Sequence, residues 1–304
     1  MPRTTVEQNA ARRRAATSML ATELVGDVAR AIAGPGMQVM PVKGALLQHW
    51  LYEDPAERPM TDVDLLVRPD DFGSVVECLE AAGYRRTRHR SVGGIVMETP
   101  FGLALDLHSQ LFDCARYRMP TADLFARSSE DHVLYGASVQ IPSPLDVYAH
   151  LIGKFGSDHL DGKATARLDE IARMETRLDA SPEAVARHLV LCGMRRASRY
   201  VLPLVHRAVG GGFALRVYDS LPFDPMGRGV AATANLLLAG AAPGALGGAL
   251  VAHMLNDSLP RGVHSGARAL LQRARRSGRD GANRAGPRGP LGGWRRNAAR
   301  RDGL

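Results

Sequence analysis

The sequence predicts an α+β protein with a mixed, mainly antiparallel sheet and flanking helices, followed by a helical domain and a disordered basic tail. Three observations support this prediction. Between residues 37 and 142, short stretches with the alternation typical of strands are interleaved with helical patterns. From residue 143 onward, apolar residues recur mostly at helical spacing. Residues 261–304 hold twelve arginines and two aspartates among many glycines, a composition that cannot bury a core.

These patterns divide the chain into four segments. We expect an N-terminal helix at 1–36, a core at 37–142, a helical domain at 143–260 and the tail at 261–304. A length of 304 residues suffices for two domains, and a hydrophobic content of 45% is that of a globular protein. The formal net charge of +8 arises in the tail, because the remainder has slightly more acidic than basic residues.

The first half of the chain is expected to alternate between helices and strands. A helix at 5–33 is stopped by the Gly-Pro-Gly sequence that follows it, and the turn at Lys43-Gly44 separates a strand from the next helix. Proline at 55 breaks that helix, because proline restricts the residue before it. The expected elements after the first helix are strand 37–42, helix 45–53, strand 62–67, helix 70–82, and strands 84–88, 92–98, 102–109 and 133–141. The turn at 99–102 makes 92–98 and 102–109 an antiparallel pair.

The second half is expected to be helical. Residues 230–255 lack Asp, Glu, Lys and Arg and are long enough to span a membrane. Their glycines and Pro243 instead predict a break between two buried helices, so no membrane partner is expected. The expected helices lie at about 144–156, 164–178, 181–192, 194–209 and 226–256.

The strand at 62–67 carries two carboxylates on one face. Side chains alternate along a strand, so Asp62 and Asp64 point to one side and Val63 to the other. Such a pair costs free energy unless positive charge lies between its members, and Mg²⁺ prefers oxygen ligands of this kind. The alternative is that Asp62 caps a turn and Asp64 pairs with an arginine.

Two further features favour a metal site. Lys43 and Gly44 open a helix, which places backbone N–H groups and an ammonium group where a phosphate can bind. A third carboxylate, Asp106, lies on an alternating strand with His108 on the same face. His108 either contacts a ligand, acts as a base or positions Asp106.

Several separated motifs together resemble one known family. The segment VKGALLQHWLYEDPAERPMTDVDLLV at 42–67, then AAGY and then LDLH, is similar to the nucleotidyltransferase-fold, or polymerase-beta-like, superfamily. More narrowly, it resembles an uncharacterised bacterial branch with the pattern KG…RPxxDxDLLV…DLH. The match covers Val39 to Leu111, with a looser match to about Arg177. One departure is that Lys43-Gly44-Ala45 replaces the usual Gly-Ser turn, so no hydroxyl is offered to the phosphates there.

The resemblance implies a metal-dependent transfer of NMP from an NTP to an acceptor hydroxyl, with release of pyrophosphate. Asp62, Asp64 and Asp106 would be the catalytic metal ligands for two Mg²⁺ or Mn²⁺ ions. The implied nucleotide-binding residues are Lys43, Gly44, Arg58, His108 and Lys154, with the helical domain closing the cleft. Arg58 either contacts the triphosphate or the metal carboxylates, or forms a structural ion pair with Asp62 or Asp64.

The acceptor and the role of the tail stay open at this point. The acceptor is a small metabolite or natural product, a peptide or protein, or a tRNA, and ATP is favoured as the nucleotide only because it is common. The alternative function is a non-catalytic nucleotide- or partner-binding module that contacts nucleic acid through the tail at 261–304. The tail can also be a solvated segment without a partner.

The cysteines and the N-terminus indicate the cellular compartment. Cys78, Cys114 and Cys192 are widely spaced and form no CxxC pair, which indicates neither a disulfide framework nor a zinc site. The N-terminus lacks the continuous apolar stretch of a secretory signal. We therefore expect a cytoplasmic protein.

Overall fold

The structure is a computed structural model that describes residues 5–34, 36–88, 93–112, 116–158, 167–239 and 253–258, together with residues 260, 262 and 267. The chain divides into two units, residues 1–265 and 266–304. The first unit holds the sheet and the helices that position the site. The predicted tail falls almost entirely outside the described residues.

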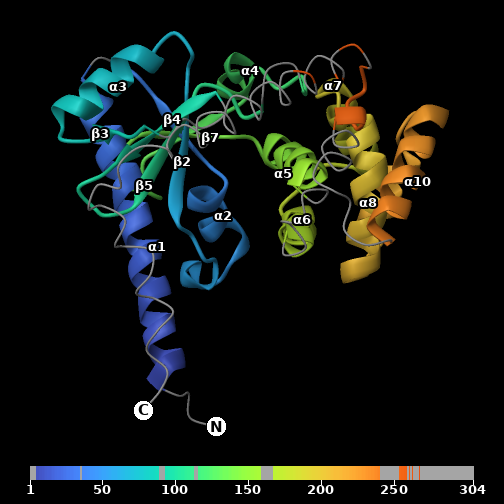
Figure 1. Ribbon diagram of the computed structural model, residues 1–304, viewed down its shortest axis with the longest axis horizontal. Helices are drawn as coiled ribbons and strands as arrows, with labels where there is room; N and C mark the ends of the chain where they lie inside the picture. Colours follow the sequence, from blue (N-terminus) through green and yellow to red (C-terminus); the bar gives the residue numbers. More distant parts are fainter. Residues whose placement is uncertain are drawn as a thin grey trace, which may run out of the picture. The chain divides into compact units, whose positions relative to one another are not determined.

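A five-stranded sheet forms the core of the first unit (Figure 1). Its central strands are parallel, and every other neighbouring pair is antiparallel. In spatial order the strands are β1 (Val39–Val42), β2 (Asp62–Val67), β5 (Ala104–His108), β4 (Gly94–Glu98) and β3 (Arg85–Arg86). This arrangement confirms the predicted mixed, mainly antiparallel sheet.

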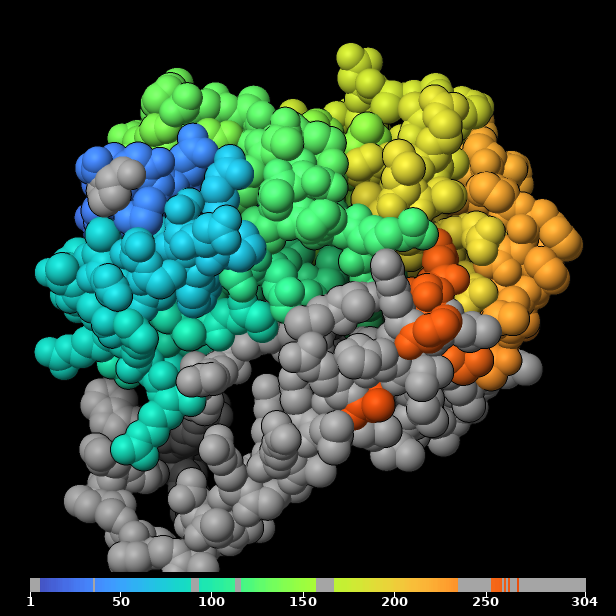
Figure 2. Space-filling model, turned by 90° about the horizontal axis from the view of Figure 1, so that it is seen from above, coloured from blue at the N-terminus to red at the C-terminus, as the bar shows by residue number. Residues whose placement is uncertain are grey.

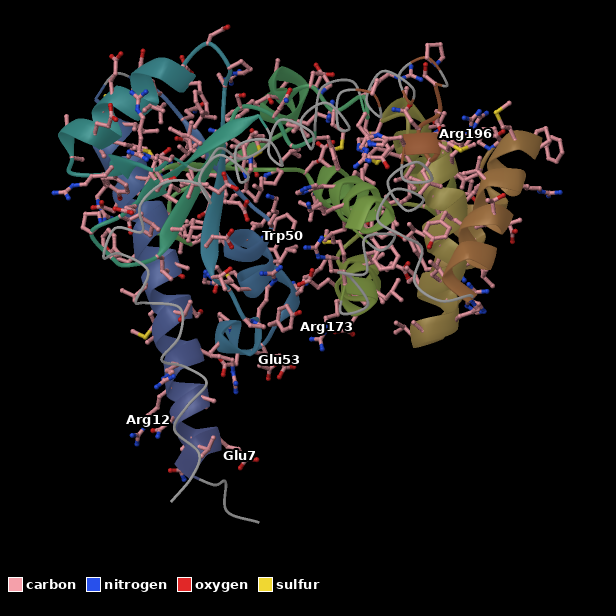
Figure 3. The ribbon with its side chains drawn as sticks, in the orientation of Figure 1. Glu7, Arg12, Trp50, Glu53, Arg173 and Arg196 are labelled. Carbon is pink, nitrogen blue, oxygen red and sulfur yellow. The ribbon has the colours of Figure 1, made fainter. Side chains whose placement is uncertain are left out.

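Helices near the N-terminus pack on the sheet. The helix α1 (Thr5–Ile32) contacts α3 (Phe72–Ala81) and β2, and it buries an apolar stripe that includes Leu24, Val25 and Val28. Its N-terminal turns, which carry Glu7 and Arg12, extend beyond the sheet (Figure 3). The short helix α2 (Gly44–Leu51) and a 3₁₀ turn, η1 (Pro55–Glu57), connect β1 to β2.

The segment between the sheet and the helical part differs from the prediction. The helix α4 (Thr121–Ala126) was not predicted, and the strand predicted at 133–141 is wrong over most of its length. A two-stranded hairpin of β6 (Ser129–Asp131) and β7 (Val139–Ile141) occurs instead. The cause is a turn, because Asp131 Oδ1 accepts hydrogen bonds from the backbone N–H groups of Val133 and Leu134.

Helices dominate after residue 143, as predicted. These are α5 (Pro144–Asp158), α6 (Arg167–Glu175), α7 (Pro182–Leu191), α8 (Arg195–Val209), the unpredicted α9 (Phe213–Asp219) and α10 (Pro225–Ala239). In Figure 2 the green segment that includes α4 lies between the cyan segment of α3 and the yellow segment of α7 and α8. The predicted break near Pro243 lies outside the described residues. Among the residues that are described, no helix has the length and apolar composition needed to cross a membrane.

Arginine side chains connect the helical part to the rest of the unit. Arg173, labelled in Figure 3, donates from α6 to the backbone oxygen of Leu51 at the end of α2, and its guanidinium lies 4.8 Å from the ring centroid of Tyr52. Arg127, just after α4, donates two hydrogen bonds of 2.9 Å to the buried Asp146 on α5. These contacts hold α5 and α6 beside the edge of the sheet that carries β1 and α2.

Candidate active site

The parallel strands β2 and β5 bring two carboxylates together. Asp64 and Asp106 are direct partners in the register, and both side chains point to the same face. Leu65 and Leu107, the next pair, point into the core and are fully buried. The apolar residues of each strand thus anchor one face, and the carboxylates occupy the other.

Lys43 brings a positive charge to this pair from the turn between β1 and α2. Its ammonium Nζ lies 2.5 Å from Asp64 Oδ1 and 3.3 Å from His108 Nε2. Its backbone φ of 51° makes it the one non-glycine residue with positive φ among those described. Sparsely populated backbone conformations of this kind concentrate at functional sites.

His108 connects the two carboxylates. Its Nε2 lies 2.9 Å from Asp64 Oδ1 and 3.3 Å from Asp106 Oδ2, and its side chain is buried. Burial by itself would lower the pKa of His108, but the hydrogen bonds with Asp106 and Asp64 outweigh it, so the pKa is raised. The geometry fits the positioning role considered for His108, extended to both aspartates.

The two aspartates of β2 differ in environment. Burial would raise the pKa of Asp64, but the hydrogen bond with His108 and the charge of Lys43 lower it to about 2. Asp62 is exposed, and its Oδ1 accepts a hydrogen bond of 3.1 Å from Thr61. Partial burial and the negative charge of Asp64 raise the pKa of Asp62. Asp64 is therefore firmly ionised, whereas Asp62 is open to solvent and to ligands.

The donor set fits a divalent cation. Three residues, Asp64, Asp106 and His108, each offer a ligand atom within 4.8 Å of the others. Asp62 lines a cavity that Asp64 and Asp106 also line. Asp106 Oδ1 is buried and has no hydrogen-bond partner among the described residues. A buried carboxylate oxygen without a partner is costly, and a hard cation such as Mg²⁺ would satisfy it.

Arg58 forms an ion pair that was not predicted. Its Nε lies 2.8 Å from Glu170 Oε1 on α6, with both side chains mostly buried, instead of pairing with Asp62 or Asp64. Arg58 also covers the first residue of α2: a Cβ atom built on Gly44 would lie 2.6 Å from Arg58 Nη1 and 2.9 Å from Met60 Sδ. Glycine at 44 thus permits the close approach of the arginine to the start of the helix.

The change Gly44→Ala is expected to displace Arg58 and weaken its ion pair with Glu170. Crowding of this kind typically costs about 1–3 kcal/mol, and we expect a loss in that range in urea unfolding. In an Arg58→Ala background the same change should cost less, because the displaced group is then absent. A single variant as stable as the wild type would contradict the packing argument.

A cavity of about 410 Å³ unites these residues. Carboxylates of the sheet line it together with cationic side chains from several elements, and Lys154 of α5 and Arg167 of α6 lie on the helical side. All eight site residues proposed from the sequence except His108 line this cavity, and His108 contacts two that do. Sequence reasoning missed Glu170 and His150, which also line it.

A second cluster of titratable side chains is structural. Asp146, His188 and Cys192 come close together, but the carboxylate of Asp146 also accepts hydrogen bonds from Arg127 and Ser143. Burial raises the pKa of Cys192 to about 12, so its thiol is not reactive near neutral pH. This cluster fixes α4 and α7 to α5.

The mixed sheet and the carboxylates of its parallel strands define a nucleotidyltransferase fold. The chain belongs to the family described as uncharacterised nucleotidyltransferase, whose model matches residues 3–210, and it is therefore an enzyme of the nucleotidyltransferase class. The comparison with curated proteins finds no match.

Solved structures with 15% sequence identity resemble the chain. The solution structure of the antibiotic-resistance factor ANT(2'')-Ia has a TM-score of 0.42 and covers 61% of this chain and 96% of that one. A crystal structure of ANT(2'')-Ia in complex with adenylyl-2''-tobramycin has a TM-score of 0.42, with 56% and 94% covered. An antigenic nucleotidyltransferase-like protein from Paracoccidioides brasiliensis has a TM-score of 0.40, with 65% and 92% covered. Likenesses this distant identify no acceptor for this chain.

Proposed function

We propose that the enzyme transfers NMP from an NTP, with ATP the first to be tested, to a hydroxyl group of its acceptor. The observation that carries this proposal is the pairing of Asp64 with Asp106 at a cavity that also holds Asp62 and Lys43. In the reaction the acceptor oxygen attacks the α-phosphorus and the bond from that phosphorus to the β-phosphate oxygen breaks. Pyrophosphate leaves with the electron pair, and the hydroxyl proton is lost to solvent.

Asp62, Asp64 and Asp106 would hold two Mg²⁺ or Mn²⁺ ions. When bound, these ions would neutralise phosphate charge and stabilise the attacking and leaving oxygens. His108 keeps the carboxylates of Asp64 and Asp106 in fixed positions through its contacts with both. In this proposal the chain supplies mainly positioning and charge neutralisation, as is usual for phosphoryl transfer.

Lys43 has two positions in this proposal. In the free enzyme its ammonium group neutralises Asp64. A cation that binds Asp64 would repel this ammonium group, and the long side chain, about a quarter exposed at 26%, can turn toward the phosphates. The backbone N–H groups that begin at Gly44 offer further donors for a phosphate, which compensates for the missing Gly-Ser hydroxyl.

Arg58 and Lys154 would bind phosphate oxygens whose charge the metal ions and Lys43 do not neutralise. Both line the cavity, and the ion pair with Glu170 holds Arg58 in place. The acceptor is proposed only as a hydroxyl compound: a small metabolite or natural product, a peptide or protein, or a tRNA. A contact of the tail with nucleic acid stays a prediction, because the tail lies almost entirely outside the described residues.

Calorimetry with each of the four NTPs tests the proposal. We expect one or more NTPs to bind the wild type in the presence of Mg²⁺, and to bind much more weakly without it or in Asp62→Asn. Asp62 is the suitable position because its exposed side chain has little part in the fold. Binding that is equal with and without Mg²⁺, or no binding to a folded protein, would contradict the proposal. An α-phosphate-labelled form of the nucleotide that binds then identifies the acceptor by transfer of label.

A further inference from the structure

The helix α5 presents one face to the cavity. Val147, His150, Leu151 and Lys154 line it, and their spacing of three and four residues places them on one side of the helix. Val147 and Leu151 give this face an apolar background. His150 and Lys154, one turn apart, are polar side chains on this face. Asp146, one turn before His150, also lines the cavity, and its carboxylate is bound by Arg127, Ser143 and His188.

His150 is buried without a partner. Its side chain is 6% exposed, and its Nε2 atom has no hydrogen bond to any of the described residues. The edge of its ring packs on Phe112, with the ring centroids 5.3 Å apart. Buried polar atoms in native proteins nearly always have partners, so a buried Nε2 without one, on a residue that lines the cavity, calls for a ligand.

Two ammonium groups act on this ring. Burial, followed by the charges of Lys43 and Lys154, lowers the pKa of His150 to about 3. The ring is therefore neutral near pH 7 and has one N–H to donate. An anion attracted by the two lysines would meet this N–H in a dry environment, where a hydrogen bond to a charged group is strong.

We propose that His150 is a nucleotide-binding residue whose Nε2–H donates to an oxygen of the β- or γ-phosphate, between Lys43 and Lys154. The inference rests on the proposed function, because it assumes a triphosphate in this cavity. It adds a neutral donor to the charged groups of the site. Its consequence is that His150 contributes to ligand affinity and not to the stability of the free protein.

Three variants test this assignment. His150→Phe keeps the ring packing on Phe112 and removes the polar atom, and His150→Gln restores a donor at a similar reach. Tyr148→Phe is the matched control: Tyr148 is a fully buried residue of the same helix whose hydroxyl donates to Glu175 Oε1 at 3.1 Å, and it does not line the cavity. Stability is measured by urea unfolding without ligand. Affinity is measured by calorimetry with MgATP, AMP and inorganic tripolyphosphate.

We expect His150→Phe to be at least as stable as the wild type at pH 7.5 and to bind MgATP and tripolyphosphate about 10–100-fold more weakly, the range for a hydrogen bond to a charged group. AMP affinity should change little, and His150→Gln should recover part of the loss. Tyr148→Phe should show the opposite pattern, with lower stability and unchanged affinity.

Two outcomes would overturn the assignment. In the first, His150→Phe binds tripolyphosphate and MgATP as tightly as the wild type does. In the second, its affinity for AMP falls as much as its affinity for MgATP. If the wild type binds neither nucleotides nor tripolyphosphate, both the proposed function and this inference fail. If it binds MgATP and His150→Phe does so equally well, the inference alone fails.

Discussion

Replacing Asp106 with asparagine is expected to reduce nucleotidyl transfer by at least about 100-fold, since a lost metal ligand removes several kcal/mol of transition-state stabilisation and each 1.36 kcal/mol is tenfold. Asparagine has the shape of aspartate but lacks the negative charge that a cation requires. Asp106 Oδ1 has no protein partner among the described residues, and the amide oxygen of asparagine can still accept from His108 Nε2 in place of Oδ2, so the fold loses little. Initial rates of pyrophosphate release and Mn²⁺ binding followed by electron paramagnetic resonance give two independent readouts.

Glu98→Gln is the matched control for this prediction. Glu98 is an exposed carboxylate on β4, the strand next to β5, and it does not line the cavity. Its transfer rate and metal affinity should equal those of the wild type. Asp64→Asn is less suitable, because Asp64 is buried against Lys43 and His108 and its change would also disturb the fold. A fully active Asp106→Asn variant would remove Asp106 from the mechanism.

The sheet could be predicted because its signals are local. In β2 the alternation of Asp62, Val63 and Asp64 ends in a fully buried apolar run, and both the strand and its orientation follow from a few neighbouring residues. The strand predicted at 133–141 is wrong for a related reason. Val133 resembles a strand residue, but its backbone N–H donates to Asp131 Oδ1 in a turn. The side chain of Val133 is 87% exposed there.

The site could be predicted only in part, because its partners are distant in sequence. The pair of carboxylates on β2 requires positive charge, but nothing in the pattern says that Lys43 and His108 supply it. Arg58 and Glu170 are separated by 112 residues, and Glu170 resembles any acidic residue in the first turn of a helix. Such pairings depend on how α6 packs beside α2, which local periodicity does not contain.

His150 illustrates a signal that was present but unspecific. It is a histidine on the apolar face of a helix, four residues before Lys154, and most such histidines are satisfied core residues. Only its burial, together with the absence of a partner for Nε2 among the described residues, distinguishes it.

The burial of His150 also predicts a strong loss of stability in acid. The pKa of His150 is about 3 in the folded protein and 6.5 when unperturbed, so between these values the unfolded chain binds a proton that the folded chain does not. Stability therefore falls as the pH decreases below 6.5, by roughly 3 kcal/mol at pH 4.5 and by roughly 4 kcal/mol at pH 3. Asp64, whose pKa is lowered to about 2, adds a loss only below about pH 4.

The variant His150→Phe should remove this slope, because phenylalanine has no proton to bind. Urea unfolding at pH 7.5 and pH 4.5 is expected to show a loss in the wild type that is larger than that in His150→Phe by roughly 3 kcal/mol. Tyr148→Phe keeps His150 and should keep its contribution to the slope, since a buried tyrosine with a raised pKa does not titrate in this range. The loss of its hydrogen bond raises the pKa of Glu175 further, which reduces the acid loss in this variant. The lowered pKa of His49 adds a loss common to all three proteins. The raised pKa of His108 acts in the opposite direction, because its stabilisation is complete below pH 6.5 and is lost as the pH rises through its folded pKa. This gain is also common to all three proteins and cancels in the comparison. Equal slopes in the wild type and His150→Phe would show that His150 is protonated in the folded protein, and a charged ring at this position would require a carboxylate as its partner.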